Sequence, residues 1–161
     1  MSEALQDHWR ELVARIAVGW PEENYLALAE SCTGGMVGAA ITSLPGVSRW
    51  FRGGVVAYHN DLKTQALGVT EQLLQEFGAV SEQCARSMSR GVRKVLSAEL
   101  GLAVTGIAGP DGATEDKPVG LVYIALSDSE RESCERFNFP GDRDADRIAA
   151  VEQALLMLDN W

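Results

Sequence analysis

The chain has 161 residues, a length that suits one domain with a buried core. Hydrophobic residues make up 46% of the sequence and charged residues 23%, which are ordinary proportions for a globular protein. The formal net charge of −9 argues against a general nucleic-acid binder or a protein of anionic membranes, because an acidic chain repels polyanions, although a few local amides and cations can still hold a small phosphorylated ligand.

Helices and strands alternate in the first half of the chain. Apolar residues at helical spacing predict a helix over residues 3–18, and the short apolar run at 25–29 predicts a buried strand. A helix rich in small residues is expected at 34–44 and a second strand at 54–58. Three further helices are predicted in succession at 60–65, 70–77 and 81–99, beginning at Asn60, Thr70 and Ser81.

The second half adds the remaining strands and a last helix. A strand is predicted at 102–105, followed by a loop over 106–118 that is rich in glycine and proline. Residues 119–126 and 132–139 are expected to pair as a hairpin, and residues 142–158 as a helix. This order predicts the α/β class: one three-layer α/β/α domain over residues 1–161, with a mixed, mostly parallel sheet.

Metal and redox chemistry find little support in the composition. The three cysteines are widely spaced, the two histidines are isolated, and no metal-ligand spacing is present, so we expect no metal and no cofactor. No apolar run is long enough to span a bilayer, and the first residues lack the basic start and apolar middle of a signal peptide. We therefore expect a cytoplasmic protein with reduced thiols and no membrane partner.

The segment 31–35 joins the strand at 25–29 to a helix. At the carboxyl end of a strand, a helix N-terminus offers free amides and a positive dipole end to an anion, with hydroxyls from Ser31 and Thr33 and close approach at Gly34 and Gly35. The alternative is a plain N-cap followed by packing glycines. Neither G-x-G-x-x-G nor G-x-x-x-x-G-K-[ST] is present, so the loop is of neither the Rossmann nor the Walker type.

Tyr58 and Lys63 are candidates to activate the Ser31 hydroxyl. A serine needs a base to take its proton, and a lysine can serve only if desolvation or nearby positive charge lowers its pKa from about 10.4. Tyr58 could relay the proton or fix the lysine. His59 is a competing base, but strand alternation points it away from a site that Tyr58 faces. The alternative is a surface lysine beside a strand-end tyrosine.

Two later segments could bind an anion. The loop that starts at Thr105 exposes successive amides around its glycines and has Lys117 at its far side, although it could equally be a plain surface loop. Asp142 is a plausible cap for the last helix, and Arg143 and Arg147 lie four residues apart on one helix face. Arginine suits bidentate phosphate binding, but at least one of the two is expected to be a solvated helix charge.

Taken together, these segments resemble the C-terminal domain of the CinA (competence/damage-inducible) family, whose stand-alone members are nicotinamide-nucleotide amidases. The likeness covers nearly the whole chain in order. It rests on Ala-Glu-Ser-Cys-Thr-Gly-Gly at 29–35, Tyr-x-Asn-x-x-Lys at 58–63, Gly-Ala-Val-Ser-Glu at 78–82, Thr-Gly-Ile-Ala-Gly-Pro-Asp-Gly at 105–112 running to Lys-Pro-Val-Gly at 117–120, and Gly-Asp-Arg at 141–143. His59 and Asp61 depart from the usual family pattern.

The resemblance implies hydrolysis of the carboxamide of nicotinamide mononucleotide to nicotinic acid mononucleotide and ammonia. Ser31 would be the nucleophile and Lys63 its base, with Tyr58 assisting, and one of two arginines would meet the phosphate. The residues expected to bind substrate are Glu30, Thr33, Gly34, Gly35, Thr105, Gly106, Ile107, Ala108, Gly109, Arg143 and Arg147.

Other functions remain open at this point. The chain could be a catalytically inactive nucleotide-binding module of the same family. A pyrophosphatase is less favoured, since that chemistry uses Mg²⁺ and clustered carboxylates. The resemblance also implies a homodimer, and Trp50 and Phe51 could either form an exposed interface patch or belong to the core.

Overall fold

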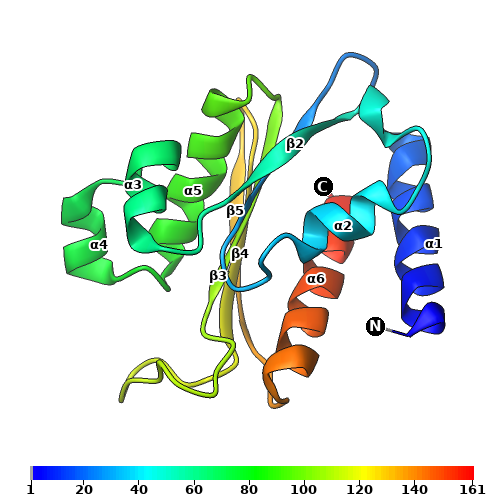
Figure 1. Cartoon of the computed structure of the whole chain (residues 1–161). Helices are drawn as coiled ribbons and strands as arrows, with labels where there is room; N and C mark the ends of the chain where they lie inside the picture. Colours follow the sequence, from blue (N-terminus) through cyan, green and yellow to red (C-terminus); the bar gives the residue numbers. More distant parts are fainter. Residues whose placement is uncertain (1) are drawn as a thin grey trace.

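A five-stranded sheet forms the middle layer of the molecule in the computed structural model, which describes residues 2–161 (Figure 1). The strands are β1 (Leu26–Glu30), β2 (Phe51–Val56), β3 (Leu100–Gly106), β4 (Leu121–Ser127) and β5 (Glu132–Asn138), in the spatial order β2-β1-β3-β4-β5. β1 pairs in parallel with β2 and β3, and β4 pairs antiparallel with both β3 and β5. The predicted α/β class with a mixed sheet is confirmed.

Helices cover both faces of this sheet (Figure 1). α1 (Glu3–Gly19), α2 (Met36–Thr42) and α6 (Arg143–Asp159) pack on one face, and α3 (Asn60–Leu67), α4 (Glu71–Phe77) and α5 (Glu82–Val95) pack on the other. A short 3₁₀ helix, η1 (Val47–Arg49), precedes β2 and was not predicted. Within residues 2–161, no helix is both long enough and apolar enough to cross a membrane.

Polar caps set the starts of the helices much as the sequence indicated. Thr70 and Ser81 accept hydrogen bonds from amides in the first turns of α4 and α5, and Asp142 does the same for α6. The exception is α3, where His59 is the N-cap instead of Asn60 and its Nδ1 accepts from the amide of Asp61. The Asn60 side chain does not cap the helix, and its Oδ1 lies 3.5 Å from the amine of Lys63 one turn later in α3.

Small residues allow α5 to lie close against the sheet. The side chains of β1 alternate, with Leu26 and Leu28 in the core beside α1, α2 and α6, and Ala27 and Ala29 in the core beside α5. In β3, a Cβ at Gly101 would lie 2.1 Å from the carbonyl oxygen of Ser89 in α5. Strands β1 and β3 are therefore packed closely on both faces, and the loops that follow begin from their buried carboxyl ends.

β2 begins three residues earlier than its apolar run at 54–58 predicted. The pairing register shifts between Leu26 and Ala27, where β1 pairs with this strand. Gly53 and Gly54 interrupt the apolar pattern by which the start of the strand could have been predicted. Trp50, only 4% exposed, stacks on Trp20 with 4.9 Å between ring centroids. Trp50 thus belongs to the core, and the alternative of an exposed interface patch there is wrong.

Candidate active site

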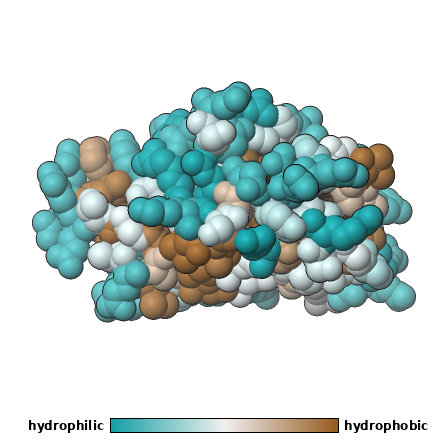
Figure 2. Space-filling model, turned by 90° about the horizontal axis from the view of Figure 1, so that it is seen from above, coloured by the Kyte–Doolittle hydropathy of each residue, from teal (hydrophilic) through white to brown (hydrophobic). Residues whose placement is uncertain are grey.

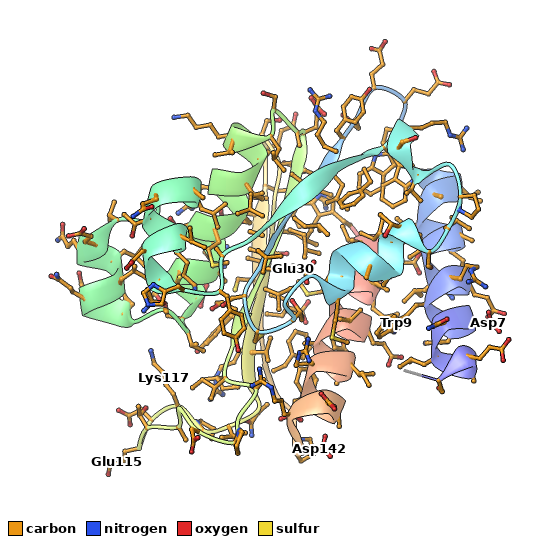
Figure 3. All side chains as sticks on the ribbon, viewed as in Figure 1. Asp7, Trp9, Glu30, Glu115, Lys117 and Asp142 are labelled. Carbon is orange, nitrogen blue, oxygen red and sulfur yellow. The ribbon has the colours of Figure 1, made fainter. Side chains whose placement is uncertain are left out.

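Loops at the carboxyl ends of β1, β2 and β3 meet at one edge of the sheet, because these three strands run in parallel. They carry residues 31–35, 57–63 and 107–118, and the start of α6 joins them from the opposite layer. Figure 3 shows Glu30 between the sheet and the start of α2, with Asp142 and Lys117 toward the lower end of the view. Four of the segments singled out in the sequence therefore converge in space.

Lys63 reaches Ser31 at the centre of this convergence. The Nζ of Lys63 lies 3.1 Å from the Oγ of Ser31, and the two residues are only 2% and 7% exposed. The same nitrogen lies 3.1 Å from the carbonyl oxygen of Ala57 and 3.5 Å from Oδ1 of Asn60. A neutral amine has two N–H donors and one lone pair, so the Ala57 and Asn60 oxygens can take both donors and leave the lone pair for the Ser31 hydroxyl.

Burial favours that neutral amine. It lowers the pKa of Lys63 below the ordinary lysine value, because the ammonium form loses its hydration. Two thiols lie near the amine, and burial raises the pKa of Cys32 to about 12 and that of Cys84 to about 11. Both thiols are therefore neutral near pH 7, and neither supplies the negative charge that would hold a proton on Lys63.

Glu30 caps α2 instead of facing a substrate. Its carboxylate accepts hydrogen bonds from the amides of Gly35, Val37 and Gly38 over 3.0, 3.1 and 2.8 Å. Strand alternation explains this correction, since Glu30 follows Leu26 and Leu28 on the face that α2 covers. The amides that the sequence suggested for a ligand anion are thus already occupied by the protein's own carboxylate.

The glycines after Ser31 are needed for the turn itself. Gly34 and Gly35 have φ angles of +61° and +95°, which favour glycine, and Gly34 donates its amide to the carbonyl of Ser31 over 3.0 Å. A Cβ at either glycine would meet only ordinary protein contacts at 3.5 and 3.7 Å, so within the protein the backbone conformation is what requires glycine. Among residues 2–161, the amides of Cys32 and Thr33 find no oxygen acceptor.

Thr33 is fully buried in the same turn. Its hydroxyl has no hydrogen-bond partner in the part of the chain that the structure describes. Its carbonyl accepts from the amide of Met36 and from Arg147.

Tyr58 makes no hydrogen bond to Lys63 within residues 2–161. Its hydroxyl accepts a hydrogen bond from Arg143 over 2.9 Å, and its side chain is largely exposed. Arg143 also donates to the carbonyl of Gly109 over 2.6 Å. Because β2 ends at Val56, Tyr58 lies beyond the strand and turns toward α6, so the expected relay between tyrosine and lysine is absent from this structure.

The two arginines of α6 have different partners. Arg147 donates from Nε to the carbonyl of Cys32 and from Nη2 to that of Thr33, each over 3.1 Å. Its remaining nitrogen lies 3.6 Å from the carboxylate of Asp144. Arg147 is therefore engaged with the loop of Ser31, whereas Arg143 lies exposed at the start of α6.

The end of β3 and the first residues of the loop after it mostly bond to other parts of the protein. Thr105 was expected to bind substrate. Its hydroxyl instead donates to the carbonyl of Ala79 over 2.7 Å in a buried position, and so links β3 to the segment before α5. A Cβ at Gly106 would lie 2.7 Å from the carbonyl oxygen of Leu121, and Ile107 donates its amide to that same oxygen. Beyond these, the backbone amides of Ala108 and Gly109 have no acceptor within residues 2–161.

Sequence reasoning overlooked Asn60 as a partner of Lys63. The two residues are three apart at the start of α3, a spacing that places them on one helix face. The Tyr-x-Asn-x-x-Lys pattern contained this signal. The Ala57 carbonyl, by contrast, is a backbone group whose position no residue type reveals.

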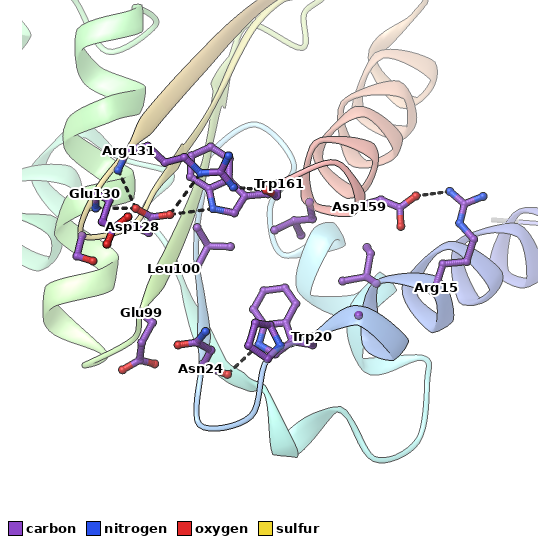
Figure 4. Close-up of a pocket in the computed structure, with 15 residues that line it drawn as sticks. Arg15, Trp20, Asn24, Glu99, Leu100, Asp128, Glu130, Arg131, Asp159 and Trp161 are labelled. Atoms are coloured by element: carbon purple, nitrogen blue, oxygen red, sulfur yellow. Dashed lines mark hydrogen bonds and ion pairs between the residues drawn. The ribbon is translucent and has the colours of Figure 1, made fainter.

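A separate cavity of about 550 Å³ lies at the other edge of the sheet, near the start of β3 (Figure 4). Its polar side chains pair with one another: Trp161 and Arg131 with Asp128, and Arg15 with Asp159. The surface at this end is largely hydrophilic, with apolar areas between the polar side chains (Figure 2). None of the predicted site residues lines this cavity. Across residues 2–161 no group of three or more His, Cys, Asp or Glu side chains is arranged to hold a metal ion.

Comparison with known proteins identifies close relatives. A CinA-like protein of Geobacter sp. (strain M21) is 52% identical over 136 residues, which cover 84% of this chain and 33% of that protein. The chain spans about a third of the length of the curated relatives it matches.

Solved structures share the fold. The competence/damage inducible protein CihA from Agrobacterium tumefaciens has a TM-score of 0.87 at 35% identity, covering 100% of this chain and 98% of that chain. The competence damage-inducible protein A (ComA) from Klebsiella pneumoniae subsp. pneumoniae MGH 78578 has a TM-score of 0.87 at 34% identity, covering 94% and 95%. A family model described as the CinA C-terminal domain matches residues 11–161, and this chain therefore belongs to the CinA C-terminal domain family.

Proposed function

We propose that this protein is an amidohydrolase that converts nicotinamide mononucleotide to nicotinic acid mononucleotide and ammonia, and that residues 1–161 form the amidase domain. The observation that carries the proposal is the buried Lys63 amine, 3.1 Å from the Ser31 hydroxyl. Burial lowers the pKa of this lysine, and a lowered pKa is what a lysine base requires. The amidase activity is a property that family membership suggests and that the Ser31–Lys63 geometry supports.

In the first half of the reaction, Ser31 Oγ attacks the carboxamide carbon while the Lys63 amine takes the hydroxyl proton. The carbonyl oxygen becomes an oxyanion, which unpaired amides in the loop can stabilise. When the tetrahedral intermediate collapses, the C–N bond breaks and the Lys63 ammonium gives its proton to the leaving nitrogen. Ammonia departs, and an ester joins Ser31 to the acyl group.

Water completes the cycle. The Lys63 amine accepts a proton as water attacks the ester carbon, and it returns a proton to Ser31 Oγ as the C–O bond breaks. The balance is one carboxamide and one water consumed, with one carboxylic acid and one ammonia formed. Because Ala57 and Asn60 supply acceptors beside the same nitrogen, both protonation states of Lys63 have partners during the cycle.

The substrate phosphate is assigned to Arg143. This arginine is exposed at the rim, where Tyr58 and the carbonyl of Gly109 hold it in place. Arginine suits phosphate because its guanidinium can donate two parallel hydrogen bonds. The homodimer is a further proposal, which the molecular mass in solution would test.

Ammonia release from nicotinamide mononucleotide tests the proposed reaction. We expect turnover by the wild-type protein with and without a chelator, and none above background by Ser31→Ala. A thermal unfolding measurement controls for folding of the variant. Full activity in Ser31→Ala would exclude this mechanism. Binding of the nucleotide by the wild-type protein with no ammonia over hours would instead support the inactive binding module.

A further inference from the structure

Arg147 anchors the peptide groups that follow Ser31. Its Nε is the only donor to the Cys32 carbonyl within residues 2–161, and its Nη2 shares the Thr33 carbonyl with the amide of Met36. The side chain comes from α6, 115 residues further along the chain than Cys32. Without this contact the Cys32 carbonyl would have no donor among residues 2–161.

The anchor fixes the direction of a neighbouring N–H. In a planar trans peptide the carbonyl and the following N–H point in opposite directions, so holding the Cys32 oxygen orients the Thr33 amide. The Ser31 carbonyl is held in the same way by the amide of Gly34, which orients the Cys32 amide. Two adjacent N–H groups beside the nucleophile are thus directed by contacts on their far sides.

Both amides keep their capacity to donate. Both amides donate toward the Cys32 sulfur, and this offsets part of the effect of burial, which raises the pKa of that thiol to about 12. A neutral thiol is a weak acceptor, so it does not satisfy them. Hydrogen bonds from a guanidinium to the carbonyl also polarise the peptide group and strengthen its N–H as a donor.

We propose that Arg147 is a positioning residue that preorganises the amides of Cys32 and Thr33 as the oxyanion site of the reaction. This inference rests on the proposed amidase function, and it separates two arginines that lie one helical turn apart. Arg143 acts on substrate binding at the rim. Arg147 acts through the loop backbone, on a group that gains negative charge only as the reaction proceeds.

Steady-state kinetics of ammonia release separate these roles. In Arg147→Ala we expect kcat to fall about 100-fold, the usual effect of losing an oxyanion donor, with KM changed less than about threefold. Arg147→Lys keeps one donor and should lose less, and added guanidinium should restore part of the kcat of Arg147→Ala. Asp144→Ala is the matched control for kcat, because the exposed Asp144 carboxylate reaches only the outer nitrogen of Arg147, and this variant should keep the wild-type kcat.

Amide NMR gives a second measurement that needs no turnover. In Arg147→Lys we expect the resonances of the Cys32 and Thr33 amides to shift or broaden, while that of Leu73 in α4 stays in place. This variant also carries the test if Arg147→Ala does not fold. An inactive wild-type protein would defeat the amidase proposal, whereas unchanged Cys32 and Thr33 resonances would overturn the role of Arg147. In an active protein, unchanged kcat with a raised KM in both Arg147 variants would also overturn it.

Discussion

The Tyr58 hydroxyl accepts a hydrogen bond from Arg143, although the two residues are 85 positions apart in the chain. Arg143 uses its other terminal nitrogen to bind the carbonyl of Gly109, so one guanidinium links the segment after β2, the loop after β3 and the start of α6. The contact places Tyr58 at the rim of the site. The hydrogen-bond partners of Lys63 are other groups, Ser31, Ala57 and Asn60, deeper in the protein.

Tyr58→Phe is therefore expected to affect substrate binding more than chemistry. The change removes one acceptor of Arg143 and leaves the three contacts of Lys63 intact, so KM should rise by about three- to tenfold, the effect of one lost hydrogen bond. The pH dependence of kcat should stay that of the wild-type protein. A 100-fold lower kcat with an altered pH profile would instead restore the proton relay expected from the sequence.

The pH dependence of activity should report the buried lysine. Only the neutral Lys63 amine can accept the Ser31 proton, and burial lowers its pKa below the ordinary lysine value. The rate constant kcat/KM should therefore rise with pH along a limb that lies below the usual titration range of lysine. Lys63→Arg should be inactive throughout, because an arginine stays protonated. A rising limb at the ordinary lysine pKa would contradict the assignment.

The same titration should appear in stability. The folded pKa of Lys63 is lowered, so between that value and the unfolded pKa the unfolded chain binds more protons, and the free energy of unfolding rises with pH. Below the folded pKa both states are protonated, and the full cost of a buried ammonium remains. In Lys63→Met, the free energy of unfolding measured with denaturant should lack this rise. An identical pH dependence of that free energy in the variant would contradict the lowered pKa of Lys63.

Glu30→Ala should destabilise the fold. The substitution removes the acceptor of three amides at the start of α2 in a buried position, and we expect a loss of about 2 kcal/mol or more in the free energy of unfolding. Glu30→Gln keeps one oxygen acceptor and should lose less. A fully stable Glu30→Ala protein with a raised KM would mean that Glu30 contacts substrate after all.

Gly101→Ala tests the close packing of α5 on the sheet. The new Cβ would lie 2.1 Å from the carbonyl oxygen of Ser89, so the helix must move, and we expect a loss of about 3 kcal/mol, the upper range for overpacking. Gly19→Ala is the matched control, since nothing lies within 4 Å of its added Cβ. Its melting temperature should stay close to that of the wild-type protein, and equal effects of the two changes would disprove the packing argument.

Local patterns in the sequence were sufficient for most elements of the fold. The strand at β1, the caps at Thr70, Ser81 and Asp142, and the hairpin of β4 and β5 all follow from spacing or residue type within a few positions. β2 was misplaced because it is an edge strand with two glycines and a register slip. Its neighbours in space, not its own apolar residues, set its bounds.

The candidate site divides in the same way. Motifs at residues 31–35 and 58–63 were enough to bring Ser31 and Lys63 into one hypothesis. The partners of Glu30, Tyr58 and Arg147 were not foreseeable, because each satisfies a group that another segment leaves unpaired: helix amides, a guanidinium, and loop carbonyls. Residue type states what a side chain can donate or accept. Which group is left for it depends on the packing of α2 and α6 against the sheet, which only the tertiary structure decides.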